Sequence, residues 1–337
     1  MWRKPQRRFE SCPLRQLRLL NRRATAVGIM KTEIDAFVCL PVHVCVCICT
    51  FNRPERVGTL LRTLGQQVTG GEFTLSAVVC DNDSARSAQA QVSKAAAALS
   101  FPVVYCVEPE QNIAMARNCA VRHSAGDFVA FIDDDEIPSP DWLWTALRAC
   151  QLHSADGVLA PVRPRFEHAP PAWLLKGGFC ERREHTTGHT LSWRETRTGN
   201  VLLRRALLEG GVEPFDVAYG NGGEDTAFFK RLMASGARFV WCNEAPVHEL
   251  VPPDRCERRY LLKRAMLRGQ NEKKFANSAS VCKSMLAVVV YTVALPFAWL
   301  AGQHRLMQVA IRLCDHAGKL LGVAGLKPLG PKYLSPE

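Results

Sequence analysis

The sequence lacks several widespread ligand-binding signatures. No C-x-x-C pair occurs among its 14 cysteines, no G-x-G-x-x-G follows the first predicted strand, and no G-x-x-x-x-G-K is present. These absences disfavour a zinc knuckle, a Rossmann dinucleotide site and a P-loop. The chain of 337 residues shows no internal repeat and is long enough for one large domain with an appendage, or for two small domains.

The cysteines lie mostly in apolar runs. Cys45, Cys47 and Cys49 alternate with aliphatic residues, so on an extended strand they share one face. Sulfur atoms spaced along a line do not surround a metal ion. We therefore predict small buried core thiols, which implies a reducing cytosol.

Positive charge is in excess. The formal net charge is +11, which favours an anionic partner: nucleic acid, a phosphorylated substrate or an anionic membrane surface. Eight of the basic residues lie in the first 29, and no apolar signal-peptide core accompanies them. Residues 1–40 are expected to form a basic extension that is disordered, or that is partly untranslated if synthesis starts at Met30.

The segment from 42 to 144 alternates between strand and helix patterns, which predicts an α/β domain with a mostly parallel sheet flanked by helices. In such a sheet, ligands bind at the carboxyl ends of the strands, and here three of these ends carry polar clusters. The predicted strands are Val42–Thr50, Leu75–Cys80, Val103–Val107 and Phe128–Ile132; the predicted helices are Arg53–Val68, Ser87–Leu99 and Ile113–Ser124.

The most informative of these clusters is the run Asp133-Asp134-Asp135-Glu136, which follows an apolar strand. Adjacent like charges repel and are tolerated where water or a cation offsets them. Carboxylate oxygens suit Mg²⁺ or Mn²⁺, which commonly bridge carboxylates to substrate phosphates. A solvated acidic turn is the alternative for this run taken alone.

The second half is less regular. Pro161–Arg197 is rich in Pro, Trp, Arg and His and is predicted to be a long excursion over the active site. Strand, helix and strand follow at Thr198–Leu203, Thr226–Ser235 and Arg238–Trp241, then a loop with His248 and a basic helix, Arg258–Gly269.

The C-terminal region, 276–337, is predicted to be a hydrophobic and amphipathic helical tail. Met285–Gly302 is uncharged and at the lower length limit for a membrane span, and Arg305–Leu321 is amphipathic. Basic residues follow the apolar stretch, which opposes a simple span under the positive-inside rule. We expect a helical pair lying on, or dipping into, the inner leaflet; a true span and a helix buried against the catalytic domain are the alternatives.

Five stretches together resemble family 2 glycosyltransferases of the GT-A fold, and in particular the succinoglycan-type exopolysaccharide glucosyltransferases. They cover roughly residues 42–270 in the family's order, and their combination is far more specific than any one of them. The stretches are Cys47–Arg56 (CICTFNRPER), Asn112–Asn118 (NIAMARN), Phe131–Glu136 (FIDDDE), Thr198–Asn200 (TGN) and Gly222–Phe229 (GGEDTAFF).

The resemblance implies a catalytic domain over residues 41–275 that binds a nucleotide-sugar donor, expected to be a UDP-sugar, with a divalent metal, Mg²⁺ or Mn²⁺. The family pattern assigns nucleobase, ribose and phosphate contacts to seven positions and metal ligation to two. The first set is Thr50, Asn52, Arg53, Asp81, Arg117, Asp133 and Asp134, and the second is Asp135 and His248.

Each assignment has a plainer alternative. Asp81 could be a cap at the end of a strand, Arg117 a surface arginine and His248 a structural histidine. The stretch beginning at Asp81 reads Asp-Asn-Asp-Ser, where many relatives carry Asp-Asp-Gly-Ser, so the base contacts are less firmly assigned than the acidic run.

For catalysis, the resemblance points to Asp225 as the base that deprotonates an acceptor hydroxyl, with Glu224 positioning the acceptor. The alternative is an ordinary acidic pair at a helix N-terminus. Two further sets were considered: Arg259, Arg264 and Arg268 as a clamp for pyrophosphate, a contact with anionic lipid or a solvated face, and Trp173 and Trp193 as sugar contacts or loop packing.

The predicted function is inverting transfer of a hexose from a UDP-sugar to a polyprenyl-diphosphate-linked saccharide during exopolysaccharide or cell-surface glycan synthesis. The enzyme is expected at the cytoplasmic side of the membrane, without a nucleic-acid partner. A basic nucleic-acid-binding module is disfavoured because aromatic residues do not interleave with the basic ones. A sugar nucleotidyltransferase is disfavoured because its glycine-rich arginine signature is absent near the first strand.

Overall fold

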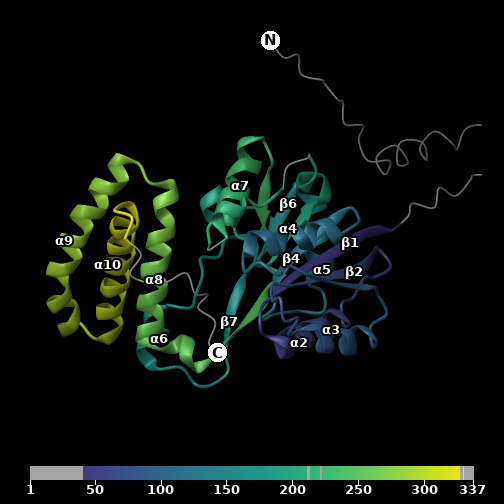
Figure 1. Ribbon diagram of the computed structural model, residues 1–337, viewed down its shortest axis with the longest axis horizontal. Coiled ribbons are helices and arrows are strands. Elements are labelled where there is room, and N and C mark those ends of the chain that lie inside the picture. Colours follow the sequence, from purple (N-terminus) through teal and green to yellow (C-terminus); the bar gives the residue numbers. More distant parts are fainter. Residues whose placement is uncertain (1–40, 211–212, 221, 327–328, 330–337) are drawn as a thin grey trace, which may run out of the picture. The chain divides into compact units, whose positions relative to one another are not determined.

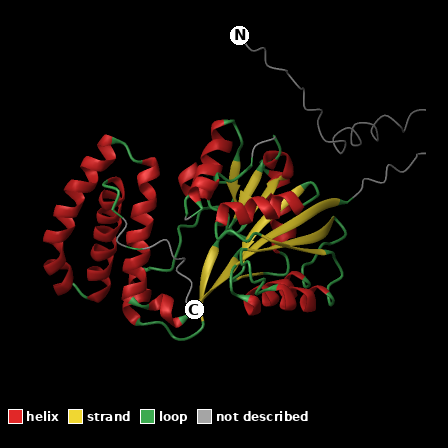
Figure 2. Ribbon diagram, in the orientation of Figure 1, coloured by secondary structure: helices red, strands yellow, loops and turns green. Residues whose placement is uncertain are grey.

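A computed structural model describes residues 41–210, 213–220, 222–326 and 329. The predicted N-terminal extension, 1–40, lies outside the described residues. The domain is built on a seven-stranded sheet with the order β3-β2-β1-β4-β8-β6-β9 (Figures 1 and 2). Its strands are β1 (Val42–Thr50), β2 (Phe73–Asp81), β3 (Val103–Val107), β4 (Phe128–Asp133), β6 (Gly157–Leu159), β8 (Val201–Arg204) and β9 (Phe239–Trp241).

The first four strands are parallel, as predicted, and their carboxyl ends meet at one edge. Thr50 at the end of β1 is in register with Asp81 at the end of β2, and Cys49 is in register with Asp133 at the end of β4. Only β8 runs against its neighbours β4 and β6. The parallel pairing is what brings polar residues far apart in sequence to one place.

Helices cover both faces of the sheet. They are α2 (Pro54–Leu64), α3 (Gln89–Ala96), α4 (Ile113–His123), α5 (Trp142–Leu152) and α7 (Glu224–Ala234). The aliphatic residues of β1 pack with α2, α3 and α5, whereas Cys45 and Cys47 pack with α4 and α7. The predicted alternation of β1 is thus confirmed, and each fully buried aliphatic side chain contributes roughly 1.5–3 kcal/mol.

Two helices are shorter than the sequence pattern indicated. α2 begins at Pro54, with Glu55 in its first turn, and ends at Leu64 rather than Val68. α3 spans Gln89–Ala96 instead of 87–99, because its last residues form tighter turns in which the amides of Ala98 and Leu99 bond to carbonyls three residues back.

The predicted excursion over 161–197 is more ordered than expected. It contains β7 (Val162–Phe166) and α6 (Ala172–Gly177), and β7 joins a second sheet with β5 (Glu136–Pro138) and β10 (Val247–Val251). The sequence did not reveal this sheet, because β5 has only three residues and Pro138 and Pro164 interrupt the strand pattern. His248, predicted in a loop, therefore lies within a strand.

Asn200 of the Thr198-Gly199-Asn200 stretch joins three segments of the domain. Its side-chain oxygen accepts a hydrogen bond from the indole Nε1 of Trp142 (2.7 Å), and its amide nitrogen donates to the carbonyls of Pro161 (2.7 Å) and Ala245 (2.9 Å). The residue is buried and has φ of 55°, a left-handed conformation that asparagine adopts more readily than most residues.

Replacing this side chain should destabilise the domain. We expect Asn200→Ala to lower the free energy of unfolding by roughly 2–4 kcal/mol, since it leaves buried groups without partners and strains the backbone. Asn200→Gly should recover only the smaller, conformational part of that loss. Urea unfolding of the two variants checks this; equal stability of Asn200→Ala and the wild type would contradict it.

Three helices follow the catalytic sheet: α8 (Arg258–Glu272), α9 (Ser278–Leu300) and α10 (Gln303–Val323). α10 packs against both α8 and α9 (Figure 1). The α8–α10 crossing is close, since a side chain at Gly269 or Gly318 would collide with a backbone carbonyl of the other helix. The basic helix α8, placed with the catalytic domain from sequence, is thus also part of this helical unit.

α9 is the one described helix that is long and apolar enough to cross a membrane. Its mean hydropathy is 1.8 and only 11% of the apolar window is buried. That exposure excludes the alternative of a helix buried against the catalytic domain. Length and composition of a single helix do not distinguish a span from a helix lying on the bilayer.

Candidate active site

The site lies where β4 ends. Asp133 is the last residue of β4, Asp134 and Asp135 form the turn, and Glu136 opens β5. Glu136 is 1% exposed, and one of its oxygens accepts a hydrogen bond from the backbone N–H of Asp133 (3.0 Å). The predicted acidic run is thus a tight turn between two buried strands, not a solvated loop.

Residues at the end of β1 hold the middle carboxylate. The Thr50 hydroxyl donates to Asp134 (2.8 Å), and the Arg53 guanidinium donates to its other oxygen (3.0 Å). Burial raises the pKa of Asp134 to about 6, and the charge of Arg53 opposes that rise. Thr50, Arg53 and Asp134, which the sequence assigned to one site, therefore meet directly.

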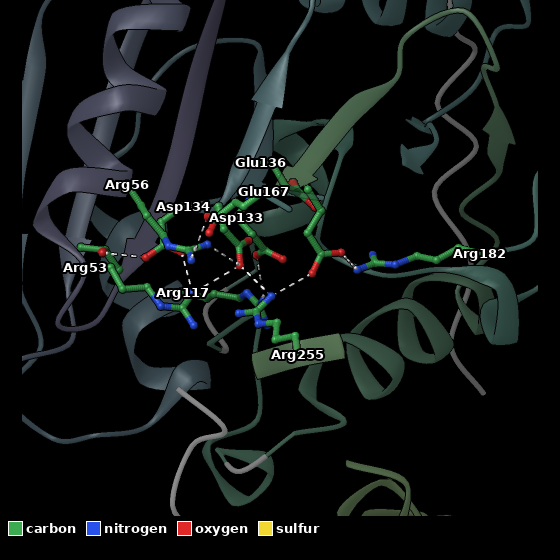
Figure 3. Close-up of polar contacts among 12 residues, drawn as sticks. Arg53, Arg56, Arg117, Asp133, Asp134, Glu136, Glu167, Arg182 and Arg255 are labelled. Carbon is green, nitrogen blue, oxygen red and sulfur yellow. Dashed lines mark hydrogen bonds and ion pairs between the residues drawn. The ribbon is translucent and has the colours of Figure 1, made fainter. Parts of the chain in front are cut away.

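Three arginines from two segments surround Asp135. Arg53 (3.4 Å), Arg56 (3.8 Å) and Arg255 (3.0 Å) each place a guanidinium nitrogen near the same carboxylate oxygen. Figure 3 shows these side chains converging on the turn from α2 and from the segment before α8. The carboxylate is 6% exposed, so its charge is offset by these arginines rather than by water.

One guanidinium nitrogen of Arg255 lies between two carboxylates. It is 3.0 Å from Asp135 and 3.1 Å from Glu249, a residue of β10 that also pairs with Arg182 (2.6 Å). The guanidinium nitrogen of Arg255 thus lies where a small cation bound by both carboxylates would lie. The donor set fits a hard divalent ion such as Mg²⁺ or Mn²⁺.

His248, the second predicted metal ligand, lies on β10 next to Glu249. Neighbouring side chains of a strand point to opposite faces, so Glu249, in register with Glu136, and His248, in register with Ile137, lie on opposite faces of β10. Burial lowers the pKa of His248, and Arg163 and Arg165 lower it further, which places the imidazole among arginines. The metal role of His248 stays a prediction, and Glu249 is a second candidate ligand because its carboxylate shares Arg255 with Asp135.

Arg117 connects the acidic turn to the start of α7. Its guanidinium forms an ion pair with Glu224 and lies 3.8 Å from Asp133. Arg117 and Glu224 are both buried, and burial raises the pKa of Glu224 even though Arg117 opposes it. The structure thus uses Arg117 as a link between predicted site residues.

Asp225 follows Glu224 in the first turn of α7. Gly223 caps this helix with φ of 93°, a conformation that favours glycine. Asp225 is half-buried and accepts hydrogen bonds from the amide (2.6 Å) and hydroxyl (3.3 Å) of Thr226. Asp225 is thus an acidic side chain in the first turn of a helix, directly after the buried Glu224.

Asp81 is fully buried at the end of β2. Its Oδ2 accepts hydrogen bonds from the Ala88 amide (2.9 Å) and the Tyr105 hydroxyl (2.8 Å), so the capping role is present. Its Oδ1 has no hydrogen-bond partner among the described residues. A buried acceptor without a donor is costly, and an N–H of a nucleobase is the kind of group that would satisfy it.

A cavity of about 330 Å³ opens above these strand ends. Its walls combine the β1 end, the acidic turn and α8; among the lining residues are Thr50, Arg53, Asp133, Asp134 and Asp135. Asn52 is exposed beside it, with φ of 51°, whereas Asp81, Arg117, Glu224 and Asp225 do not line it. The cavity has the size of a small-molecule site, and both arginines and carboxylates line it.

Comparison with known proteins agrees with this geometry. The chain is 33% identical over 302 residues to the succinoglycan biosynthesis protein ExoM of Rhizobium meliloti (strain 1021), covering 86% of this chain and 95% of ExoM. A sequence model described as glycosyl transferase family 2 matches residues 45–209. The chain belongs to glycosyltransferase family 2.

Two further similarities are more distant, and the structural one bears on the fold alone. A glucosyl-dolichyl phosphate glucuronosyltransferase of Haloferax volcanii is 27% identical over 156 residues, covering 43% of each chain. The solved structure of the mannosyltransferase PcManGT from Pyrobaculum calidifontis, in complex with GDP-Man and Mn²⁺, superposes with a TM-score of 0.60 at 17% identity, covering 94% of this chain and 95% of that one. The predicted GT-A fold and the prediction of a glycosyltransferase are thereby confirmed.

Several residues of this family 2 site were not assigned a role from sequence. Arg56 lies in the quoted stretch after β1, one helical turn from Arg53, and that spacing was the available signal. No comparable signal exists for Arg182, Glu249 and Arg255, because they reach the acidic turn only through the packing of the second sheet and of the segment before α8.

The two tryptophans considered as sugar contacts do not line the cavity at the strand ends. Trp173 packs on Phe179 with ring centroids 5.6 Å apart, and Arg258 lies over its ring. Trp193 lies beside Arg194 and Lys230 at α7. Trp173 of α6 therefore packs against neighbouring side chains, and Trp193 makes cation–π contacts.

Glu136 makes stability depend on pH. Burial, and then the charge of Asp133, raise its pKa well above the ordinary value. A carboxyl with a raised folded-state pKa stabilises the fold fully below its unfolded pKa, and this stabilisation is lost as the pH rises through the folded-state pKa. Glu136→Gln, which cannot ionise, should therefore gain melting temperature relative to wild type as the pH is raised from about 5 to 8. Thermal unfolding across that range checks this; a constant difference would contradict it.

A matched pair of variants tests which of Glu249 and His248 is a metal ligand. Glu249→Gln should raise about tenfold the Mn²⁺ concentration that half-maximal nucleotide binding requires, because a charged oxygen is lost beside Asp135. His248→Gln should leave it within about twofold. Calorimetric titration of nucleotide at several Mn²⁺ concentrations measures both. The reverse order of effects would favour His248 as the ligand over Glu249.

Proposed function

We propose that this family 2 glycosyltransferase moves a hexose from a UDP-sugar to a polyprenyl-diphosphate-linked saccharide at the cytoplasmic side of the membrane, with inversion at the anomeric carbon. The observation that carries the proposal is the arginine-lined carboxylate turn at the carboxyl ends of β1, β2 and β4. Similarity to ExoM, a protein of succinoglycan biosynthesis, supports exopolysaccharide assembly as the process.

The nucleotide would bind across the ends of β1 and β2. The buried Oδ1 of Asp81 is suited to accept a base N–H, and Thr50, Asn52 and Arg53 lie at the adjacent strand end. Uracil and guanine both carry such a donor, so the oxygen alone does not choose between UDP and GDP. We favour UDP on the match of the strand-end residues to UDP-dependent members of the family.

A divalent cation, Mg²⁺ or Mn²⁺, would be held by Asp135 and Glu249, with Asp133 and Asp134 beside it. Bound there, it would neutralise negative charge on the donor pyrophosphate. Support comes from the oxygen donors that Arg255 now bridges and from a structure of the same fold that binds Mn²⁺ with a nucleotide sugar. Arg53, Arg56 and Arg255 remain available to the phosphates.

Asp225 would act as the base. As the acceptor hydroxyl attacks the anomeric carbon, its proton passes to the Asp225 carboxylate and the nucleoside diphosphate leaves from the opposite side. Glu224, fixed by Arg117, holds the start of α7 in place. Arg117 also contacts Asp133, so the position of the base is coupled to the turn that receives the donor.

Donor binding is tested first by calorimetry with UDP and with GDP, each with and without Mn²⁺. The proposal predicts micromolar UDP binding that requires metal and is lost in Asp135→Ala, because that carboxylate anchors the cation. Preference for GDP would keep the transferase and change the donor. Equal UDP binding by Asp135→Ala and wild type would refute the metal assignment.

The base is tested by transfer of labelled hexose. Asp225→Asn should lower kcat at least about 100-fold while UDP affinity stays near that of wild type, since the amide cannot take a proton. Thr226→Val, which removes one long hydrogen bond to Asp225 (3.3 Å) and leaves the carboxylate in place, should lower kcat far less. Full activity in Asp225→Asn would exclude Asp225 as the base.

A further inference from the structure

A second cavity, of about 340 Å³, adjoins the cavity at the strand ends. The two share five lining residues, so a ligand in one can extend into the other. The shared residues are Arg182, Glu249, Arg255, Tyr260 and Arg264. The second cavity leads away from the carboxylate turn along α8 and ends at Ile311 of α10.

One face of α8 forms a wall of this cavity. Tyr260, Arg264 and Arg268 follow one another at intervals of four residues, which places them in a row along the helix. Arg259, considered together with Arg264 and Arg268 from sequence, lines a different surface near Trp173. The structure thus separates two arginines that face the cavity from one that does not.

The cavity is positively charged and has one arginine without a partner. Four arginines and two glutamates line it. Arg182 and Arg255 pair with Glu249, and Arg268 forms a bidentate pair with Asp315 of α10 (2.6 and 2.8 Å). Within the described ranges, Arg264 makes no hydrogen bond or ion pair, and its guanidinium is therefore available to an anionic ligand.

The far side of the cavity belongs to the helical unit that carries the apolar helix. α10 contributes Ile311 to the wall and packs on α9 along another part of its surface. α9 exposes a continuous apolar surface, including Leu286, Val289, Val293, Phe297 and Leu300. An amphiphile whose tail lies in the bilayer beside α9 would present its head group at the level of these helices.

We infer that this second cavity binds the phosphate groups of the lipid-linked acceptor, with Arg264 as the principal contact and Arg268 as a second one. The saccharide would then extend past Tyr260 into the shared part of the two cavities, toward the donor. The inference rests on the proposed function for the acceptor class. Its ligand chemistry is a phosphate or diphosphate esterified by the lipid at one end and by the saccharide at the other, as distinct from the nucleotide of the donor.

Kinetics of Arg264→Ala test the inference, with Lys263→Ala as the matched control: the adjacent residue, also an exposed cation of α8, does not line the cavity. Arg264→Ala should raise KM for a polyprenyl-diphosphate-linked saccharide about tenfold or more and leave UDP affinity within about twofold. With the same saccharide lacking the diphosphate, Arg264→Ala and wild type should have equal KM. Lys263→Ala should match wild type throughout.

A binding assay separates failure of this inference from failure of the proposed function. Wild type should float with phosphatidylcholine vesicles doped with polyprenyl diphosphate better than with vesicles carrying phosphatidylglycerol at equal charge, and Arg264→Ala should lose that preference. Reduced UDP affinity in Arg264→Ala would assign Arg264 to the donor and overturn the inference. Equal binding of Arg264→Ala and wild type to the doped vesicles would overturn the inference as well. Absence of hexose transfer by wild type, with the vesicle preference retained, would refute only the proposed function.

Discussion

Three successive carboxylates at the end of a buried strand need positive charge close by, and this requirement organises the site. Asp134 and Asp135 are almost fully buried, and the cost of burying them is offset by Arg53, Arg56 and Arg255. These arginines come from the start of α2 and from the segment before α8, so the turn links the β1–β4 half of the sheet to the helices that follow it. Charge balance at one turn therefore also positions distant parts of the domain.

The same balance explains how one site can receive both a cation and a pyrophosphate. Guanidinium groups now occupy the carboxylates, and Arg255 bridges Asp135 and Glu249. Under the proposed function, phosphate oxygens would give the arginines new partners and leave the carboxylates free to hold a divalent ion. Arg117, paired with Glu224 and close to Asp133, extends this arrangement to the residue beside Asp225, the proposed base.

The sequence predicted the parts of this protein that depend on local pattern. Strands β1 and β3 have the predicted bounds, because strands of alternating or continuous apolar character can be recognised from sequence. The Asp133–Asp135 turn and the end of β1 meet as expected, because these strands are parallel neighbours. The second sheet was not predicted, since its strands are short and carry prolines. That omission concealed Glu249, Arg182 and Arg255, whose positions depend on long-range packing.

The central claim is that arginines and a divalent ion share the carboxylates of the turn, and Mn²⁺ binding measured by electron paramagnetic resonance tests it most directly. Free Mn²⁺ is counted during titration of the wild-type protein, first alone and then with saturating UDP. The arginines compete with the ion until phosphate oxygens bind them, so UDP should raise the Mn²⁺ affinity about tenfold or more. Mn²⁺ should then raise the UDP affinity by the same factor. Equal Mn²⁺ affinity with and without UDP would contradict the account.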